Sequence, residues 1–169
     1  MKITTNVIKG NYDGKSCFVH ARACAVSRER LIMTTQLLNV LGNDAFSGIF
    51  TLQSFDGGKS WTPPVKDMAF APKTAENGLI YVPSDAAHLF VRSAGADLCA
   101  CHQVYYKQGG ITPVFGQKRL CTYTTYDFKR NCYRPIKTVD IPPEFRYGAA
   151  AGSAQFVEKT AGEVLIPLY

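Results

Sequence analysis

The apolar residues of this chain occur in short segments, and turn-forming residues separate many of these segments. The segments are rich in β-branched and aromatic side chains and cover residues 17–26, 31–38, 48–55, 78–84, 88–93, 103–108, 120–128 and 163–169. Several alternate with the two-residue period of half-buried strands. In residues 49–54, for example, one face would carry Ile49, Thr51 and Gln53, and the other Phe50, Leu52 and Ser54. No segment carries a helical apolar stripe with a cap at each end. The pattern therefore predicts an all-β fold.

Size and charge narrow the class of protein. A chain of 169 residues is about the length of one ordinary domain, and its 46% of apolar residues can fill a core. Lys and Arg exceed Asp and Glu by 19 to 13, which gives a net charge of +6 and suits a polyanion or an acidic sugar. The basic residues are scattered, however, and are densest at the pairs 118–119 and 129–130. Scattered charge argues against nucleic acid as a partner.

The cysteines do not form a pattern that predicts a metal site or a disulfide scaffold. The chain is larger than the small secreted scaffolds that depend on disulfides, so we expect its six cysteines to be free thiols. Residues 99–102 read Cys-Ala-Cys-His, but no second well-spaced ligand pair accompanies them, so the zinc signal is weak. We therefore expect no metal and no cofactor.

The beginning of the chain, MKITTNVIKG, lacks the apolar core of a signal peptide. No apolar stretch elsewhere is long enough to cross a membrane as a helix. The sequence thus predicts no membrane partner, and a cytoplasmic location is the default expectation.

Residues 54–64, SFDGGKSWTPP, have the composition of a tight hairpin turn. Asp56 can accept hydrogen bonds from backbone N–H groups a few residues later, and Ser54 can bond across the turn. Gly58 can adopt a positive φ, and the ring of Trp61 can fold beneath the turn. A calcium loop would need more oxygen ligands at alternate positions. We therefore interpret Asp56 as a turn residue.

A weaker copy of this motif follows later in the chain. Residues 125–135 repeat the hydroxyl, aromatic and aspartate residues, with a basic residue three places later and a final proline. A second echo relates residues 78–83 to 162–167. Because repeats of this kind indicate a repeated structural unit, the chain is predicted to hold two units of four strands and the start of a third.

The segment from Ser54 to Trp61 resembles the Asp-box of the sialidase (neuraminidase) superfamily, whose members are six-bladed β-propellers. Residues 17–26, 102–106 and 152–169 also resemble bacterial sialidase-like proteins. The resemblance implies that residues 1–169 are the N-terminal part of one such propeller, with blades at about 17–75 and 76–150 and a third beginning at 151–169. It also implies that Ser54, Asp56, Gly58 and Trp61 are structural residues of an outer hairpin.

Sialidases remove a terminal sialic acid with a tyrosine nucleophile, an arginine clamp for the sugar carboxylate and an aspartate acid/base. By resemblance, Arg22 matches the first clamp arginine, although Ala23 and Cys24 replace the usual Ile-Pro that follows it. Asp44 falls where the acid/base aspartate is expected. His102 and Gln155 match positions shared by sialidase-like relatives, and a polar residue on the inner strand of a blade can line the central sugar pocket. Each also has an ordinary structural explanation: an ion-paired arginine, a turn aspartate and two satisfied polar residues.

The remaining arginines and the nucleophilic tyrosine would belong to later blades. The resemblance therefore implies a sialidase-like glycoside hydrolase in a longer parent protein, a carbohydrate partner, and no activity for these 169 residues alone. The alternative is a non-catalytic propeller that binds glycans or another protein, because such a propeller keeps the Asp-boxes without the catalytic residues.

Overall fold

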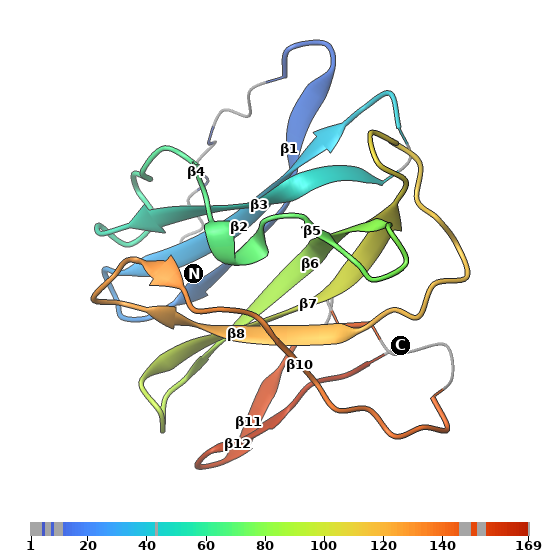
Figure 1. Ribbon diagram of the computed structural model, residues 1–169. Coiled ribbons are helices and arrows are strands. Elements are labelled where there is room, and N and C mark those ends of the chain that lie inside the picture. The colour runs from blue at the N-terminus through green and yellow to red at the C-terminus, as the bar shows by residue number, and fades with distance from the viewer. Residues whose placement is uncertain are drawn as a thin grey trace.

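The computed structural model describes residues 12–42, 44–145, 150–151 and 155–168, together with Thr5 and Ile8. Within these residues the chain is built from β-strands, and the 3₁₀ turn η1 (Met68–Phe70) is the only helical segment. The prediction of an all-β fold is confirmed. Figure 1 shows two main sheets, one built from the beginning of the chain and one from its middle, and a short hairpin near the end of the chain.

The first sheet is an antiparallel meander of four strands in chain order (Figure 1). Its strands are β1 (Ser16–Ala25), β2 (Leu31–Asn39), β3 (Ala45–Ser54) and β4 (Val65–Lys66). The three long strands match three of the predicted segments, because the apolar alternation and the turn residues between them are local features that the sequence displays directly.

The second sheet is antiparallel and curled, with strand order β10-β8-β7-β6-β5, and β9 pairs with β8 beside this path. Its strands are β5 (Lys73–Thr74), β6 (Ile80–Val91), β7 (Ala96–Tyr106), β8 (Cys121–Asp127), β9 (Cys132–Tyr133) and β10 (Lys137–Thr138). Strands β11 (Val157–Thr160) and β12 (Glu163–Leu165) form a separate hairpin.

The predicted segments 78–84 and 88–93 belong to one strand, β6. Its pairing with β7 shifts register between Ser84 and Ala87.

The main core lies between the two sheets. Its buried members are Ile32, Ile49, Phe70, Ala86, Cys99, Cys101, Tyr126 and Tyr133. Because side chains alternate along a strand, Cys99 and Cys101 of β7 join this core while Ala100 between them faces the other side. There Ala100 packs with Cys121 and Phe156. Both faces of the second sheet are therefore covered, which accounts for the many apolar residues in β7.

The hairpin of β11 and β12 is attached to the turn between β6 and β7. The carboxylate of Glu158 accepts hydrogen bonds from the backbone N–H groups of Arg92 (3.0 Å) and Ser93 (3.2 Å). The hydroxyl of Ser93 also donates to Glu158 and accepts from the N–H of Gly162 (3.0 Å). These bonds fix the hairpin against the second sheet.

Residues 54–61, which were predicted to form a tight turn, do form a turn closed by side-chain hydrogen bonds. The N–H of Ser60 donates to Asp56 Oδ1 (2.9 Å) and its hydroxyl to Oδ2 (2.6 Å). The hydroxyl of Ser54, which is 1% exposed, donates to Asp56 (2.8 Å) and accepts from the N–H of Gly58 (2.8 Å). Trp61 Nε1 donates to the Gly58 carbonyl (3.2 Å), and Gly58 has φ of 87°. The turn therefore depends on the carboxylate of Asp56 and on the freedom of Gly58.

The weaker copy forms a turn of the same kind. Asp127 accepts hydrogen bonds from the N–H groups of Lys129 (3.0 Å) and Arg130 (3.1 Å). Arg30 links the two turns, since its guanidinium donates to Gln53 (3.1 Å) and to Asn131 (3.2 Å). The same guanidinium lies over the ring of Phe128, 4.8 Å from its centre.

Acid is expected to weaken the turn held by Asp56. Hydrogen bonds from Ser60 and then from Ser54 lower the pKa of Asp56 from 3.8 to about 2. A lowered carboxyl pKa contributes stability above the unfolded pKa, and this stability is lost as the pH falls towards the folded pKa. Asp56→Asn should therefore melt at a lower temperature than wild type at pH 7, and the difference should shrink between pH 3.8 and about pH 2. Thermal melts across this range measure the difference in melting temperature.

Asp140→Asn, at an exposed position, is the control and should melt as wild type does throughout this range. An equal effect of both changes would contradict the role of the Asp56 carboxylate in the turn.

Candidate functional site

Two β-bulges, one in each sheet, direct polar side chains to the same place. The pairing of β1 with β2 shifts register between Val19 and Arg22, and that of β6 with β7 shifts between Ser84 and Ala87. Each bulge contains a non-glycine residue in the left-handed region, His20 with φ of 54° and Asp85 with φ of 56°. Such a conformation costs about 1–3 kcal/mol per residue, and bulges of this kind often re-aim side chains at functional sites.

The carboxylate of Asp85 is surrounded by three basic side chains. Its Oδ1 lies 2.7 Å from His20 Nδ1 and 3.5 Å from Arg22 Nη1. Its Oδ2 lies 3.9 Å from His102 Nε2. We call Asp85, His20, Arg22 and His102 the Asp85 cluster. It joins β1 to β6 and β7, and so connects the two sheets.

Gln36 holds the bulge of β6 in place. This residue of β2 is 1% exposed, and its Oε1 accepts a hydrogen bond from the Asp85 N–H (2.8 Å). Its Nε2 donates to the Pro83 carbonyl (3.3 Å), and His20 Nδ1 lies 3.4 Å from its Oε1. One buried amide thus binds the backbone on both sides of the bulge, which fixes the direction of the Asp85 side chain.

The Asp85 cluster is open at one end and closed at the other. The side chains of His20 and Arg22 are 35% and 27% exposed, whereas that of His102 is 4% exposed. Burial lowers the pKa of His102, so its imidazole is neutral at pH 7. Its Nδ1 lies 2.9 Å from the Ala151 carbonyl, which is the geometry of a donated hydrogen bond. The cluster thus offers solvent a guanidinium, an imidazole and a carboxylate in fixed positions.

Of the residues predicted from the sequence, the structure brings Arg22 and His102 together through Asp85. Asp44 is close to this group in the chain. It lies two residues before Phe46, whose ring is 5.3 Å from the ring of His20. Asp44 is exposed, has φ of 49°, and its carbonyl accepts a hydrogen bond from the Tyr106 hydroxyl. Its negative charge is one of the influences that raise the pKa of His102 against the effect of burial.

Gln155 is exposed just before β11, and its side chain makes no hydrogen bond within the part of the chain that the structure describes. Its role at a sugar pocket stays a prediction.

Sequence reasoning missed His20 and Asp85. The chain does carry a signal at Asp85, since it interrupts the apolar run of β6 next to Ser84. His20 has no such signal, because nothing local indicates its left-handed backbone.

The side chains of the Cys-Ala-Cys-His segment do not converge on one point. Cys99 and Cys101 lie in the core between the sheets, while His102 belongs to the Asp85 cluster. None of the six cysteines forms a disulfide. Across the described residues, three potential metal ligands converge only at Cys24, His88 and Asp97.

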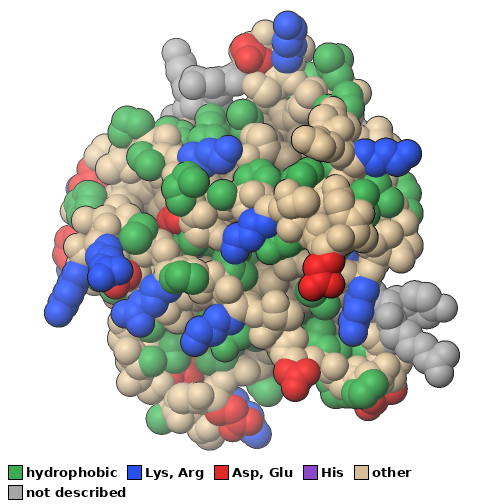
Figure 2. Space-filling view, viewed as in Figure 1, with side chains coloured by type: hydrophobic (Ala, Val, Ile, Leu, Met, Phe, Trp, Pro, Cys, Tyr) green, Lys and Arg blue, Asp and Glu red, His purple; other side chains and the backbone are tan. Residues whose placement is uncertain are grey.

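The basic residues are spread over the surface. Figure 2 shows one face on which Lys and Arg side chains are interspersed with hydrophobic, polar and acidic ones, and several of them lie near one another at the left edge. The face shown therefore has no continuous basic stripe. Among the described residues, no helix has the length and hydrophobicity needed to cross a lipid bilayer.

Comparison with known proteins gives no family assignment: no family model matches the chain, and no curated protein matches it significantly in sequence. What the chain can do must therefore be argued from its own residues.

Proposed function

We propose that this chain belongs to a sialidase-like β-propeller and that the Asp85 cluster is part of its binding site for an acidic sugar. The observation that carries the proposal is the meeting of two bulges, which hold Arg22 and two histidines around one carboxylate. Strained backbone conformations cluster at functional sites, and two of them, at His20 and Asp85, meet here. We therefore infer that these side chains serve binding and not only packing.

The chemistry of the cluster suits a carboxylated sugar. Arginine can bind a carboxylate through two parallel hydrogen bonds, and Arg22 is exposed enough to reach one. Asp85 holds the guanidinium in position from the protein side. His20, whose side chain is 35% exposed, adds a group that can hydrogen-bond to a sugar hydroxyl. The net charge of +6 favours an anionic ligand over a neutral one.

The arrangement of the first sheet supports the propeller assignment. A propeller blade is a four-stranded antiparallel meander, and β1 to β4 have this order. The turn that resembles an Asp-box lies between β3 and β4, at the last hairpin of the meander, and the resemblance implies an outer hairpin for it.

In an enzyme of this type, Arg22 would hold the sugar carboxylate and Asp44 would exchange a proton with the glycosidic oxygen. The nucleophilic tyrosine and the remaining clamp arginines would come from other blades of the parent protein. If those residues are missing from the parent, the same cluster would serve a glycan-binding propeller without catalysis.

The test is a titration with sialic acid, followed by NMR chemical shifts, with galactose as the neutral comparison. We expect sialic acid to bind more tightly than galactose, and Arg22→Ala to weaken sialic acid binding about tenfold or more, because a charged hydrogen bond contributes about 1.5–3 kcal/mol. Arg28→Ala, at an exposed position in the turn between β1 and β2, should leave binding unchanged. Circular dichroism checks that both variants fold.

Equal binding of both sugars, or equal effects of both arginine changes, would contradict the proposal. A fluorogenic sialoside then separates the enzyme from the binding protein. Hydrolysis by the full-length parent that Arg22→Ala abolishes supports a hydrolase. Binding without hydrolysis supports the non-catalytic propeller.

A further inference from the structure

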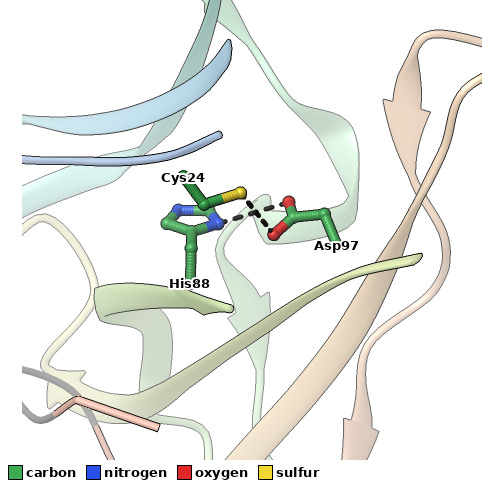
Figure 3. Close-up of side chains that lie close together, drawn as sticks. All are labelled: Cys24, His88 and Asp97. Atoms are coloured by element: carbon green, nitrogen blue, oxygen red, sulfur yellow. Dashed lines mark hydrogen bonds and ion pairs between the residues drawn. The ribbon is translucent and has the colours of Figure 1, made fainter. Parts of the chain in front are cut away.

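A second polar cluster lies inside the molecule, separate from the Asp85 cluster. Cys24 of β1, His88 of β6 and Asp97 of β7 point towards one another (Figure 3). Cys24 Sγ lies 3.1 Å from Asp97 Oδ1, and His88 Nδ1 lies 3.3 Å from Asp97 Oδ2. One ligand atom from each residue lies within 4.8 Å of the others. The side chains of His88 and Asp97 are 1% and 0% exposed.

Two neighbouring hydroxyl groups fix the orientation of this cluster. The Thr34 hydroxyl lies 2.6 Å from His88 Nε2, which turns Nδ1 of the imidazole towards the carboxylate. The Tyr133 hydroxyl donates to Asp97 Oδ2 (2.7 Å) and lies 3.2 Å from His88 Nδ1. Metal-binding histidines are held in the same way, with the second ring nitrogen bonded to an outer group.

The cluster brings a carboxylate, an imidazole and a thiol together away from solvent. The side chain of Asp97 is 0% exposed, and within the described part of the chain His88 is the only basic side chain in an ion pair with it. Buried charged groups are usually paired or bound to a metal, and the ligand atoms of this cluster lie within 4.8 Å of one another.

We propose that Cys24, His88 and Asp97 form a binding site for a zinc ion. Sulfur, imidazole nitrogen and carboxylate oxygen are the three ligand types that zinc uses. Zinc–ligand bonds of about 2.0–2.3 Å in a tetrahedron separate the ligand atoms by about 3.3–3.7 Å. Cys24 Sγ lies 3.1 Å from Asp97 Oδ1 and His88 Nδ1 lies 3.3 Å from Asp97 Oδ2, both close to this range, so an ion between the three side chains requires them to rearrange around one carboxylate. The fourth position is open to water or to the Tyr133 hydroxyl.

Charge and protons balance in this step. The Cys24 thiol loses one proton to solvent as the sulfur–zinc bond forms. In the metal-bound state, His88 gives its Nδ1 lone pair to the ion and donates its Nε2 proton to Thr34. The thiolate and the carboxylate together then neutralise the divalent ion. The site is independent of the function proposed above.

The test uses metal-free protein and cobalt(II), which replaces zinc in such sites and absorbs light when a thiolate binds it. We expect one cobalt ion per chain, a thiolate-to-cobalt charge-transfer band, release of about one proton per ion, and loss of the band when zinc is added. Cys24→Ser should lose the band. Cys17→Ser, a change of another half-buried cysteine on the same strand, should keep it.

Failure of wild type to retain cobalt, absence of the charge-transfer band or of proton release, or persistence of the band in Cys24→Ser would overturn the proposal. The cluster would then be a hydrogen-bonded network only. If Cys24→Ser does not fold, the band and the proton release of wild type decide the question. Sugar binding has no part in these measurements, so the two proposals stand or fall separately.

Discussion

Replacing Phe70 by alanine is expected to lower the free energy of unfolding by about 3–5 kcal/mol. Phe70 is 0% exposed and belongs to the core between the sheets, where its ring meets that of Tyr133 edge-on at 5.0 Å. It lies in η1, between the last strand of the first sheet and the first strand of the second. Truncation therefore leaves a cavity where the two sheets meet. Because domains are stable by only about 5–15 kcal/mol, the variant should be close to unfolding at room temperature.

Denaturant-induced unfolding, followed by tryptophan fluorescence, measures this loss. The matched control is Met68→Ala in the same 3₁₀ turn, since Met68 is 73% exposed and its truncation leaves no cavity. The control should change stability by less than about 0.5 kcal/mol, as surface substitutions usually do. Similar losses for both variants would mean that η1 contributes through its backbone and that Phe70 does not anchor the sheets.

Gln36→Leu is expected to destabilise the fold by about 2–4 kcal/mol and to remove the binding of sialic acid that depends on Arg22. Leucine has a similar volume but leaves the Asp85 N–H and the Pro83 carbonyl without their partner. An unsatisfied buried polar group costs about 1–3 kcal/mol, and the Asp85 N–H is only partly buried. Without these bonds the bulge of β6 can relax, and the carboxylate of Asp85 no longer holds Arg22.

Gln53→Leu provides the comparison, because Gln53 is a half-buried amide of β3 that bonds to Arg30 and not to the Asp85 cluster. It should bind sialic acid as wild type does. Thermal melts and the NMR titration are run on the same samples, at a temperature where both variants are folded. If Gln36→Leu loses stability but binds sialic acid normally, the bulge is not needed for binding and the proposed role of the Asp85 cluster is wrong.

The strands and turns of this protein could be read from its sequence because their causes are local. The alternation in β3 and the turn chemistry at Asp56 involve residues a few places apart. The same local reasoning divided β6 into two segments. A polar pair, Ser84 and Asp85, interrupts the apolar pattern there, yet the chain continues as one bulged strand because β7 pairs with both halves.

The sequence by itself determined an all-β chain, the places of its long strands and the turn held by Asp56. Only the tertiary structure decided which polar residues meet. Cys24 and Asp97 are 73 residues apart, and their contact depends on how two sheets pack. The bulges decide the direction of His20 and Asp85, since one residue of register moves a side chain to the other face of a strand. Register and sheet packing are set by contacts across the whole chain, so no local pattern contains them.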